Sequence, residues 1–284
     1  MDIVPLHLEE VDSTNTWAKT HCPPLNANQI TRISASMQTK GRGRFGRPWL
    51  SPKDKNIYVS FCFIPPKEAL LPHLVQLACL SSCQLIENYG LTPQIKWPND
   101  LMIQEQKIGG VLCEPQDHYV IIGIGLNVNM GEETRKKIDQ KATSFFLETK
   151  QTFDLKKVLD DLSALFIKAL LFYQKEGFSP FFKHYQSLLL YLGEMISCEH
   201  LKTSLLGIFH SVTFEGAMNL LLPSGDLQLI TSGDIKCLRR NTLNPPKRDE
   251  DFYVSTLSKN LLRNSFFMTT IVSIFWLSYQ TVIS

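Results

Sequence analysis

The sequence predicts an α+β fold in which a mixed β-sheet with helices is followed by a small β-barrel. Three features of the sequence predict it. Short segments between residues 56 and 130 are rich in alternating or β-branched apolar residues, as β-strands are. Two longer segments, 67–90 and 154–176, carry apolar residues at helical spacing. After residue 193, short apolar runs are separated by turn-forming residues, which is typical of a β-barrel.

The composition is that of a globular protein in a reducing compartment. The 284 residues leave room for one large domain or two smaller ones, and 44% are hydrophobic. The net charge of +2 is small for a dedicated nucleic-acid-binding protein. The seven cysteines are scattered without a C-x-x-C pair, which argues against a disulfide framework or a zinc site. The N-terminal segment lacks the pattern of a secretory signal, so we expect a cytoplasmic protein.

The elements of the first half are predicted in chain order. Residues 56–64 alternate in polarity and predict a half-buried strand. Residues 67–90 predict a helix with Pro72 in its first turn and a stop at Gly90. A short strand entering a turn is expected over 93–100. Two further strands are expected over 107–115 and 119–130, the second interrupted by glycines.

The second half begins with helices and ends with strands. Residues 154–176 predict an amphipathic helix with Asp154 as N-cap and Gly177 as stop. One more helix is expected over 179–193. Turn signals after Gly193 predict the small barrel, so we place a domain boundary near this residue.

The C-terminal segment is unusual. Residues 241–264 have the composition of a linker, and residues 265–284 contain no charge. The uncharged run is about as long as a membrane span, and Lys259 and Arg263 precede it as they would a cytoplasmic-side anchor. Its Ser, Thr and Gln residues fit instead a β-prone extension or a terminal accident of the reading frame. Membrane contact of this tail is therefore left open.

A basic, glycine-rich loop is the first candidate site. The segment KGRGRFGRPW, Lys40–Trp49, holds four cations and three glycines without an acid. Glycines let a backbone approach a ligand closely, successive N–H groups bind anions, and arginine adds forked donors. Trp49 offers a flat face for a base or ring. The alternatives are a solvated basic loop and a nucleic-acid contact.

Three other segments are ambiguous when taken singly. VDSTNTWAK, Val11–Lys19, fits a helix N-cap, although side chains beside a helix N-terminus also bind polar ligand groups. KWPND, Lys96–Asp100, and KIGG, Lys107–Gly110, fit a turn followed by a hairpin strand. GIGLNVN, Gly123–Asn129, lacks the third glycine of a dinucleotide-binding fingerprint.

The order of these motifs resembles that of the biotin–protein ligase family. D-S-T-N is followed by Q-x-x-G-R-G-R-x-G-R-x-W, K-W-P-N-D, K-x-G-G-x-L and G-I-G-x-N-V-N. The resemblance is specific over Val11–Asn129 and looser up to Arg240. It implies a catalytic biotin/ATP-binding domain over 1–192, related to lipoate ligases, and an SH3-like barrel over 193–240. Residues 241–284 match nothing in the family.

The resemblance also implies a reaction. The carboxylate of biotin attacks the α-phosphate of ATP and forms biotinyl-AMP with release of pyrophosphate. A lysine amine of a biotin carboxyl carrier domain then attacks this anhydride and forms an amide, which releases AMP. Such a site must neutralise charge on the carboxylate and the phosphates and hold them in line. Mg²⁺ would bridge phosphate oxygens.

The site residues follow from the same resemblance. Lys107 would contact the biotin carboxylate and the α-phosphate, Arg44 lies on the loop that folds over the adenylate, and Asp100 would orient the incoming amine. Asn127 matches a contact to the adenylate or its metal, and no metal ligand is assigned. The expected biotin-binding residues are Ser13, Thr14, Asn15, Gln38, Arg42, Gly43, Arg44 and Lys107, and the expected ATP-binding residues are Arg42, Arg44, Arg47, Trp49 and Asn127.

Three alternatives accompany this interpretation. A lipoate–protein ligase shares the fold and chemistry, but its arginine- and glycine-rich motif ending in His-Asp is absent. A biotin-sensing repressor would need a DNA-binding domain, and twelve residues before Ser13 are too few, so we expect a short form without specific DNA binding. A non-catalytic biotin-binding protein would not need the full set of charged residues. Many members dimerise, but no sequence stripe here proves a homodimer.

Overall fold

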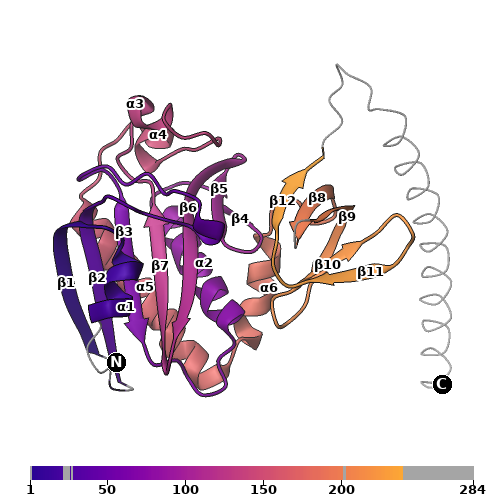
Figure 1. Cartoon of the computed structure of the whole chain (residues 1–284), viewed down its shortest axis with the longest axis horizontal. Helices are drawn as coiled ribbons and strands as arrows, with labels where there is room; N and C mark the ends of the chain where they lie inside the picture. Colours follow the sequence, from indigo (N-terminus) through magenta and orange to yellow (C-terminus); the bar gives the residue numbers. More distant parts are fainter. Residues whose placement is uncertain (1, 22–25, 27, 201–202, 239–284) are drawn as a thin grey trace, which may run out of the picture. The chain divides into compact units, whose positions relative to one another are not determined.

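The computed structural model describes residues 2–21, 26, 28–200 and 203–238, which form two compact units. Among these residues, the first unit comprises those up to Leu190 together with Phe214–Gly216, and the second comprises those of Tyr191–Thr213 and 217–238 (Figure 1). The linker and uncharged tail predicted over 241–284 lie outside the described residues. Within the described part of the chain, no helix is both long and apolar enough to cross a membrane.

A seven-stranded mixed sheet forms the centre of the first unit. Its strand order is β1-β2-β3-β7-β6-β5-β4, and only the β1–β2 pair is parallel among these neighbours. The strands are β1 Asp2–Val11, β2 Gln29–Gln38, β3 Ile57–Phe63, β4 Gln94–Lys96, β5 Asp100–Ile103, β6 Gln106–Gln116 and β7 Tyr119–Leu126.

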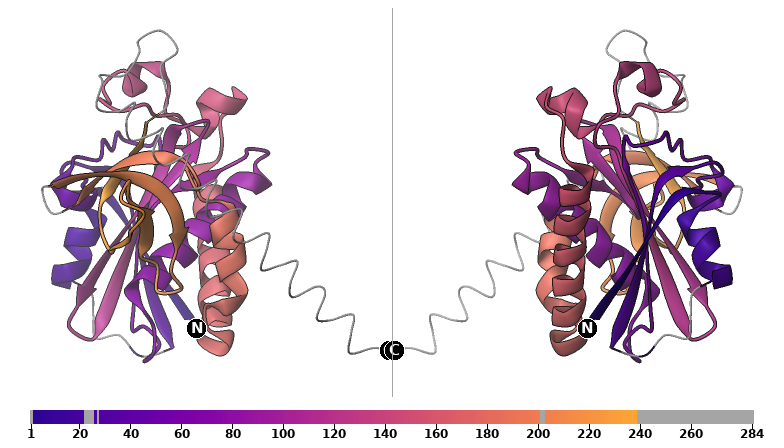
Figure 2. Two further views of the ribbon diagram at one scale, coloured as in Figure 1. Left: turned by 90° about the vertical axis from the view of Figure 1, so that its right-hand side faces the viewer. Right: turned by 90° about the vertical axis from the view of Figure 1, so that its left-hand side faces the viewer.

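Helices cover both faces of this sheet. Helix α1, Thr14–His21, packs on one face, and helices α2, Leu71–Asn88, and α5, Leu155–Glu176, pack together on the other (Figure 2). The remaining short helices are η1 Arg44–Gly46, α3 Glu132–Arg135, α4 Phe145–Thr149 and α6 Ser179–Ser187.

Strand β3 is buried on both faces, so the prediction of a half-buried strand was wrong. All seven of its residues are buried. Cys62 belongs to a core cluster with Ala18 of α1. Phe61, pointing the other way, lies 4.9 Å from the Phe166 ring of α5, centroid to centroid. A central strand with helices on both sides has no solvent-facing side, and polar residues such as Ser60 there meet other protein groups.

The two long helices are confirmed, but the last predicted helix is too long. In α5 the Asp154 carboxylate accepts from the N–H groups of the first turn. Helix α6 ends at Ser187 rather than at residue 193. The N–H of Ile95 donates to the carbonyl of Leu188, and the N–H of Leu190 donates to the carbonyl of Ile95. The segment after α6 therefore satisfies its backbone on strand β4 instead of continuing the helix.

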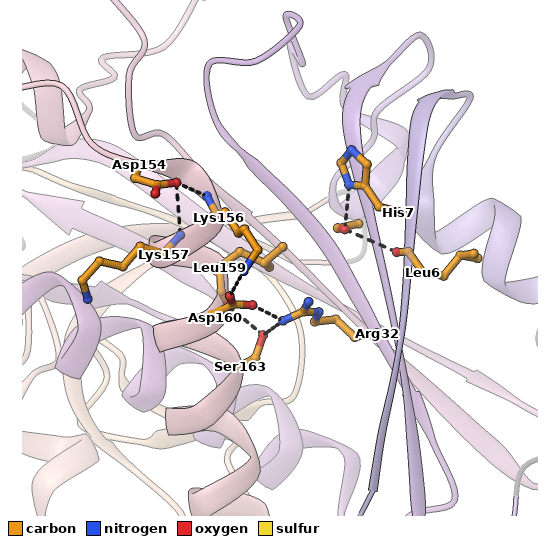
Figure 3. A network of polar contacts seen from close by, with 10 residues as sticks. Leu6, His7, Arg32, Asp154, Lys156, Lys157, Leu159, Asp160 and Ser163 are labelled. Atoms are coloured by element: carbon orange, nitrogen blue, oxygen red, sulfur yellow. Dashed lines mark hydrogen bonds and ion pairs between the residues drawn. The ribbon is translucent and has the colours of Figure 1, made fainter.

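Strands β1 and β2 were not predicted from the sequence. Arg32 interrupts the apolar pattern of β2, and the structure explains it. Its guanidinium lies 2.8 Å from the Asp160 carboxylate and 3.1 Å from the Ser163 hydroxyl, both on α5 (Figure 3). Lys156 lies 2.9 Å from the same carboxylate. The arginine thus fastens the sheet to the helix that covers it.

The second unit is a five-stranded antiparallel sheet with the order β11-β10-β9-β8-β12. Short strands joined by tight turns are what the sequence predicted, and the α+β class with a small C-terminal β-structure is confirmed. The strands are β8 Met195–His200, β9 Thr203–Val212, β10 Met218–Leu221, β11 Leu227–Ile230 and β12 Asp234–Cys237.

Candidate active site

The predicted site residues gather on the face of the sheet that α1 covers, which we call the site face. Strand β7 gives them room through two glycines. A Cβ at Gly123 would overlap Oδ1 of Asn15, and a Cβ at Gly125 would lie 2.7 Å from the indole of Trp49. The two glycines of the G-I-G motif therefore let two side chains of the protein lie close to the strand. In a dinucleotide fingerprint, the glycines let the backbone lie close to a bound pyrophosphate instead.

A network of uncharged groups surrounds the start of α1. The N–H and hydroxyl of Thr14 lie 2.9 and 3.2 Å from Oε1 of Gln38, and the Gln38 amide donates to Ser51 Oγ at 3.0 Å. Ser60 Oγ lies 2.8 Å from the Thr14 hydroxyl and 2.5 Å from Asn15 Oδ1. Ser13, Thr14 and Asn15 are each only 4% exposed. The start of the helix is thus a fixed array of donors and acceptors.

Glu114 of β6 lies beside this network and was missed by sequence analysis. Its carboxylate lies 2.9 Å from both terminal nitrogens of Arg42, 2.8 Å from Lys19 Nζ and 2.9 Å from Asn15 Nδ2. Burial raises the pKa of this carboxyl, but the hydrogen bonds from Arg42, Lys19 and Asn15 together outweigh burial and leave the pKa below its ordinary value. The one signal in the sequence was a single acid among the apolar residues and glycines of 108–115.

The glycine–arginine loop is closed at its base and exposed at its tip. The N–H of Gly43 donates to the carbonyl of Arg47 at 2.8 Å. Arg44 donates to Oδ1 of Asn99 at 3.2 Å, next to Asp100 in the chain. Phe45 has a φ of 56° and is 66% exposed. The guanidinium carbons of Arg44 and Arg47 lie 4.8 and 5.8 Å from its ring centroid.

Lys107 and Asp100 face each other across neighbouring strands. Lys107 Nζ lies 2.7 Å from Asp100 Oδ1, and the side chains are 15% and 18% exposed. The same ammonium lies 5.4 Å from the centroid of the Trp49 ring. The indole nitrogen of Trp49 is buried without a hydrogen-bond partner among the described residues. A cation, a carboxylate and an aromatic face are therefore assembled at one point.

A β-bulge places Lys107 on the site face. Leu101 of β5 pairs with Gly109, but the next residue of β5 pairs with Lys107, so Ile108 is the extra residue. Ile108 is fully buried. Because the extra residue shifts the alternation by one position, Lys107 points to the same face as Gly110 and Glu114. A regular strand would point it to the opposite face.

Asn127 lies where β7 ends, beside the backbone of the β6 start. Its N–H donates to the carbonyl of Ile108 at 2.8 Å, and its side chain donates to the carbonyl of Thr143 at 3.0 Å. Its Oδ1 lies 3.4 Å from Nδ2 of Asn56. Thr143 in turn bonds to the carbonyl of Lys107. Asn127 therefore supports the backbone around Lys107.

The structure brings most of the predicted residues into two adjoining groups. Ser13, Thr14, Asn15, Gln38 and Arg42 belong to the network around α1. Lys107, Asp100 and Trp49 form the second group, with Arg44 bound to Asn99 beside it. Arg47 contacts the Phe45 ring at the loop tip. The described residues contain no cluster of three or more His, Cys, Asp or Glu side chains that could hold a metal ion.

Comparisons with known proteins show which family the chain resembles. Residues 8–127 match the model of the Biotin/lipoate A/B protein ligase family. A bifunctional ligase/repressor BirA of Bacillus spizizenii is 32% identical over 220 residues, which cover 74% of this chain and 67% of the relative. A biotin–[acetyl-CoA-carboxylase] ligase of Paracoccus denitrificans is 29% identical over 242 residues, covering 80% and 98%. The solved biotin protein ligase from Aquifex aeolicus in complex with biotin and ATP superposes with a TM-score of 0.72 at 31% identity, covering 83% of this chain and 98% of the other.

Proposed function

Since the chain belongs to the biotin protein ligase family and is a ligase, we propose that it attaches biotin to one lysine of a biotin carboxyl carrier domain through biotinyl-AMP. The observation that carries this proposal is the position of two glycines. Gly123 lies under Asn15 and Gly125 under Trp49, two residues apart on one strand. That separation is about 7 Å, so a site for the biotin head and a platform for adenine are neighbours on one surface.

Biotin is recognised at the start of α1 in this proposal. Its cyclic urea offers one carbonyl and two N–H groups, which need donors and acceptors that are already in place. Ser13, Thr14, Asn15 and Gln38 supply them. The hydrogen bonds between Thr14 and Gln38 and between Ser60 and Asn15 hold three of these side chains in place. Ordered polar groups lose little further freedom on binding, which favours affinity.

Lys107 is the cation for the first step. Negative charge gathers where the biotin carboxylate approaches the α-phosphate, and an ammonium fixed at that point stabilises it. The ion pair to Asp100 and the Trp49 ring hold Nζ in place before substrates arrive. Arg44 adds a forked cation from the loop, and the indole of Trp49 stacks on adenine.

Asp100 serves the second step. The incoming lysine arrives as an ammonium or amine and must reach the anhydride carbon from the site face. A carboxylate 2.7 Å from Lys107 Nζ lies next to the proposed reaction point and can accept a hydrogen bond from that amine. The new amide bond forms as the bond to AMP breaks, the proton that the amine loses passes to solvent, and AMP leaves with its negative charge facing Lys107 and Arg44.

Mg²⁺ would accompany the nucleotide in this proposal. It commonly takes one or two protein oxygens and fills its shell with phosphate oxygens and water. By the resemblance to the family, Asn127 would contact the adenylate or its metal. Bound there, the ion would neutralise phosphate charge.

The experiment uses intact mass. An apo biotin carboxyl carrier domain is incubated with the chain, ATP, Mg²⁺ and either biotin or lipoate. Gain of one biotinyl group, lost with Lys107→Ala, supports the proposal. Gain with lipoate alone would assign the chain to lipoate ligation. No gain with either, from a folded protein, would overturn the ligase proposal, and biotin binding would then be measured by calorimetry.

A further inference from the structure

We infer that Glu114 is a positioning residue of the biotin site, which joins the base of the glycine–arginine loop to helix α1. The inference rests on the proposed function and adds a residue to it. Glu114 does not touch the proposed reaction point. It acts through Arg42 on the loop and through Asn15 on the helix.

The contacts of Glu114 come from three separate segments. Arg42 makes a two-pronged ion pair from the loop, and Lys19 and Asn15 reach it from α1. The carboxylate itself stands on β6, the strand that also carries Lys107. Its side chain is 15% exposed, so these contacts are partly shielded from water. A single carboxylate thus fixes loop, helix and strand relative to one another.

The contact with Asn15 determines which way its amide points. Nδ2 donates to Glu114, and Oδ1 is therefore the atom that faces Ser60 and Gly123. An amide without a charged acceptor on one side has no such preference. Because Asn15 is a proposed contact of the biotin head, Glu114 determines how the oxygen and the nitrogen of the Asn15 amide are placed when biotin binds.

The contact with Arg42 changes the role expected for that arginine. Both terminal nitrogens of Arg42 are engaged by one carboxylate in the strong fork geometry. Arg42 is therefore the anchor of the loop, whereas Arg44 lies further along the loop on Asn99. The tip can close over a ligand while its base stays attached to the sheet.

A purely stabilising role is the alternative, and the chain offers a matched control. Asp160 also bonds an arginine and a lysine, Arg32 at 2.8 Å and Lys156 at 2.9 Å, but on the face covered by α5 (Figure 3). Both carboxyls have a pKa below the ordinary value. Replacing each carboxylate by its amide removes the same kind of ion pair, once beside the site and once away from it.

The test compares Glu114→Gln with Asp160→Asn in the full chain. Steady-state biotinylation of the carrier gives KM for biotin and kcat. Hydrogen exchange reports the backbone of residues 40–49. We expect Glu114→Gln to raise KM for biotin by about tenfold or more, the size of a lost charge-assisted hydrogen bond, with a smaller change in kcat. Exchange in the loop should also become faster. Asp160→Asn should leave both readouts as in the wild type.

One further variant and two outcomes decide between these roles. Glu114→Asp keeps the charge but draws it back by one methylene, and we expect an intermediate KM. Glu114→Asp also takes the place of Glu114→Gln in the test if the amide variant does not fold. Unchanged KM and loop exchange in the folded Glu114 variants, with only a lower melting temperature, would overturn the inference and leave the ligase function standing. No biotinylation by the wild-type chain would overturn the proposed function and the inference with it.

Discussion

Lys107 and Asp100 form an ion pair of 2.7 Å between two neighbouring strands of the sheet, with Nζ 5.4 Å from the centre of the Trp49 ring. The lysine is held from two sides, by a charge and by an aromatic face. A cation that is fixed before substrate binds needs no reorganisation when charge develops, and this is the main advantage of a preorganised site.

Replacing this lysine should abolish most of the activity. We expect Lys107→Ala to lower kcat/KM for biotinylation by about a hundredfold or more, the typical cost of removing a group that stabilises developing charge. Lys157→Ala is the control, because Lys157 pairs with Asp161 on the surface of α5. Equal rates for the two variants, measured by intact mass of the carrier, would contradict the role assigned to Lys107.

Removing Arg44 should release the intermediate. The Arg44 guanidinium bonds Asn99 beside the proposed reaction point and can close the loop over the adenylate. We expect Arg44→Gly to shorten retention of biotinyl-AMP by about tenfold or more, the size of a lost charge-assisted hydrogen bond. Released anhydride should then label lysines of bystander albumin, as blotting would show. Retention equal to that of the wild type would disprove the closing role.

A methyl group at Gly125 should disturb the adenine platform. Its Cβ would lie 2.7 Å from the Trp49 indole, so the ring must move. We expect Gly125→Ala to raise KM for ATP by about tenfold, in line with the usual cost of overpacking. Gly131→Ala is the control, since its nearest neighbour is an ordinary 4.0 Å away. An unchanged KM for ATP in Gly125→Ala would remove Trp49 from the adenine site.

His73 should make stability depend on pH. Its ring bonds the Tyr173 hydroxyl at 3.2 Å and the carbonyl of Phe214 at 2.8 Å. Burial lowers the pKa of His73 below 6.5, although the Phe214 carbonyl and Glu215 act in the opposite direction. As the pH falls below 6.5, the unfolded chain takes up a proton that the folded chain does not, so folding loses stability.

The measurement is urea unfolding at two pH values. We expect the wild type to lose more stability than His73→Gln between about pH 7.5 and about pH 5.5. The variant will be less stable overall, and the comparison therefore uses only the change with pH. A pH dependence as steep in the variant as in the wild type would show that other groups cause it.

Local signals in the sequence predicted local features well. The cap at Asp154 and the stop at Gly177 set the limits of α5, because both act within a few residues of the helix end. The helix expected up to residue 193 failed because strand β4 offers its backbone to Leu188 and Leu190. This backbone pairing joins segments that are far apart in the chain, so the apolar periodicity of the helix segment cannot reveal it.

The same distinction holds for the candidate site. The candidate residues around α1 and on the basic loop could be identified from their motifs. Glu114 could not, since its partners Asn15 and Arg42 are 99 and 72 residues away in the chain. The sequence also did not predict that Lys107 and Asp100 face each other, because this depends on the one extra residue, Ile108.

That extra residue makes the site sensitive to strand register. If Ile108 were kept but paired regularly with Met102, Lys107 would turn to the opposite face of the sheet, away from Asp100 and Glu114, without any change of charge. Transplanting these side chains onto an ideal sheet would fail for the same reason. A designed protein that kept every residue of the site on a regular β-ladder would contain the correct side chains, but Lys107 would lie on the wrong face of the sheet.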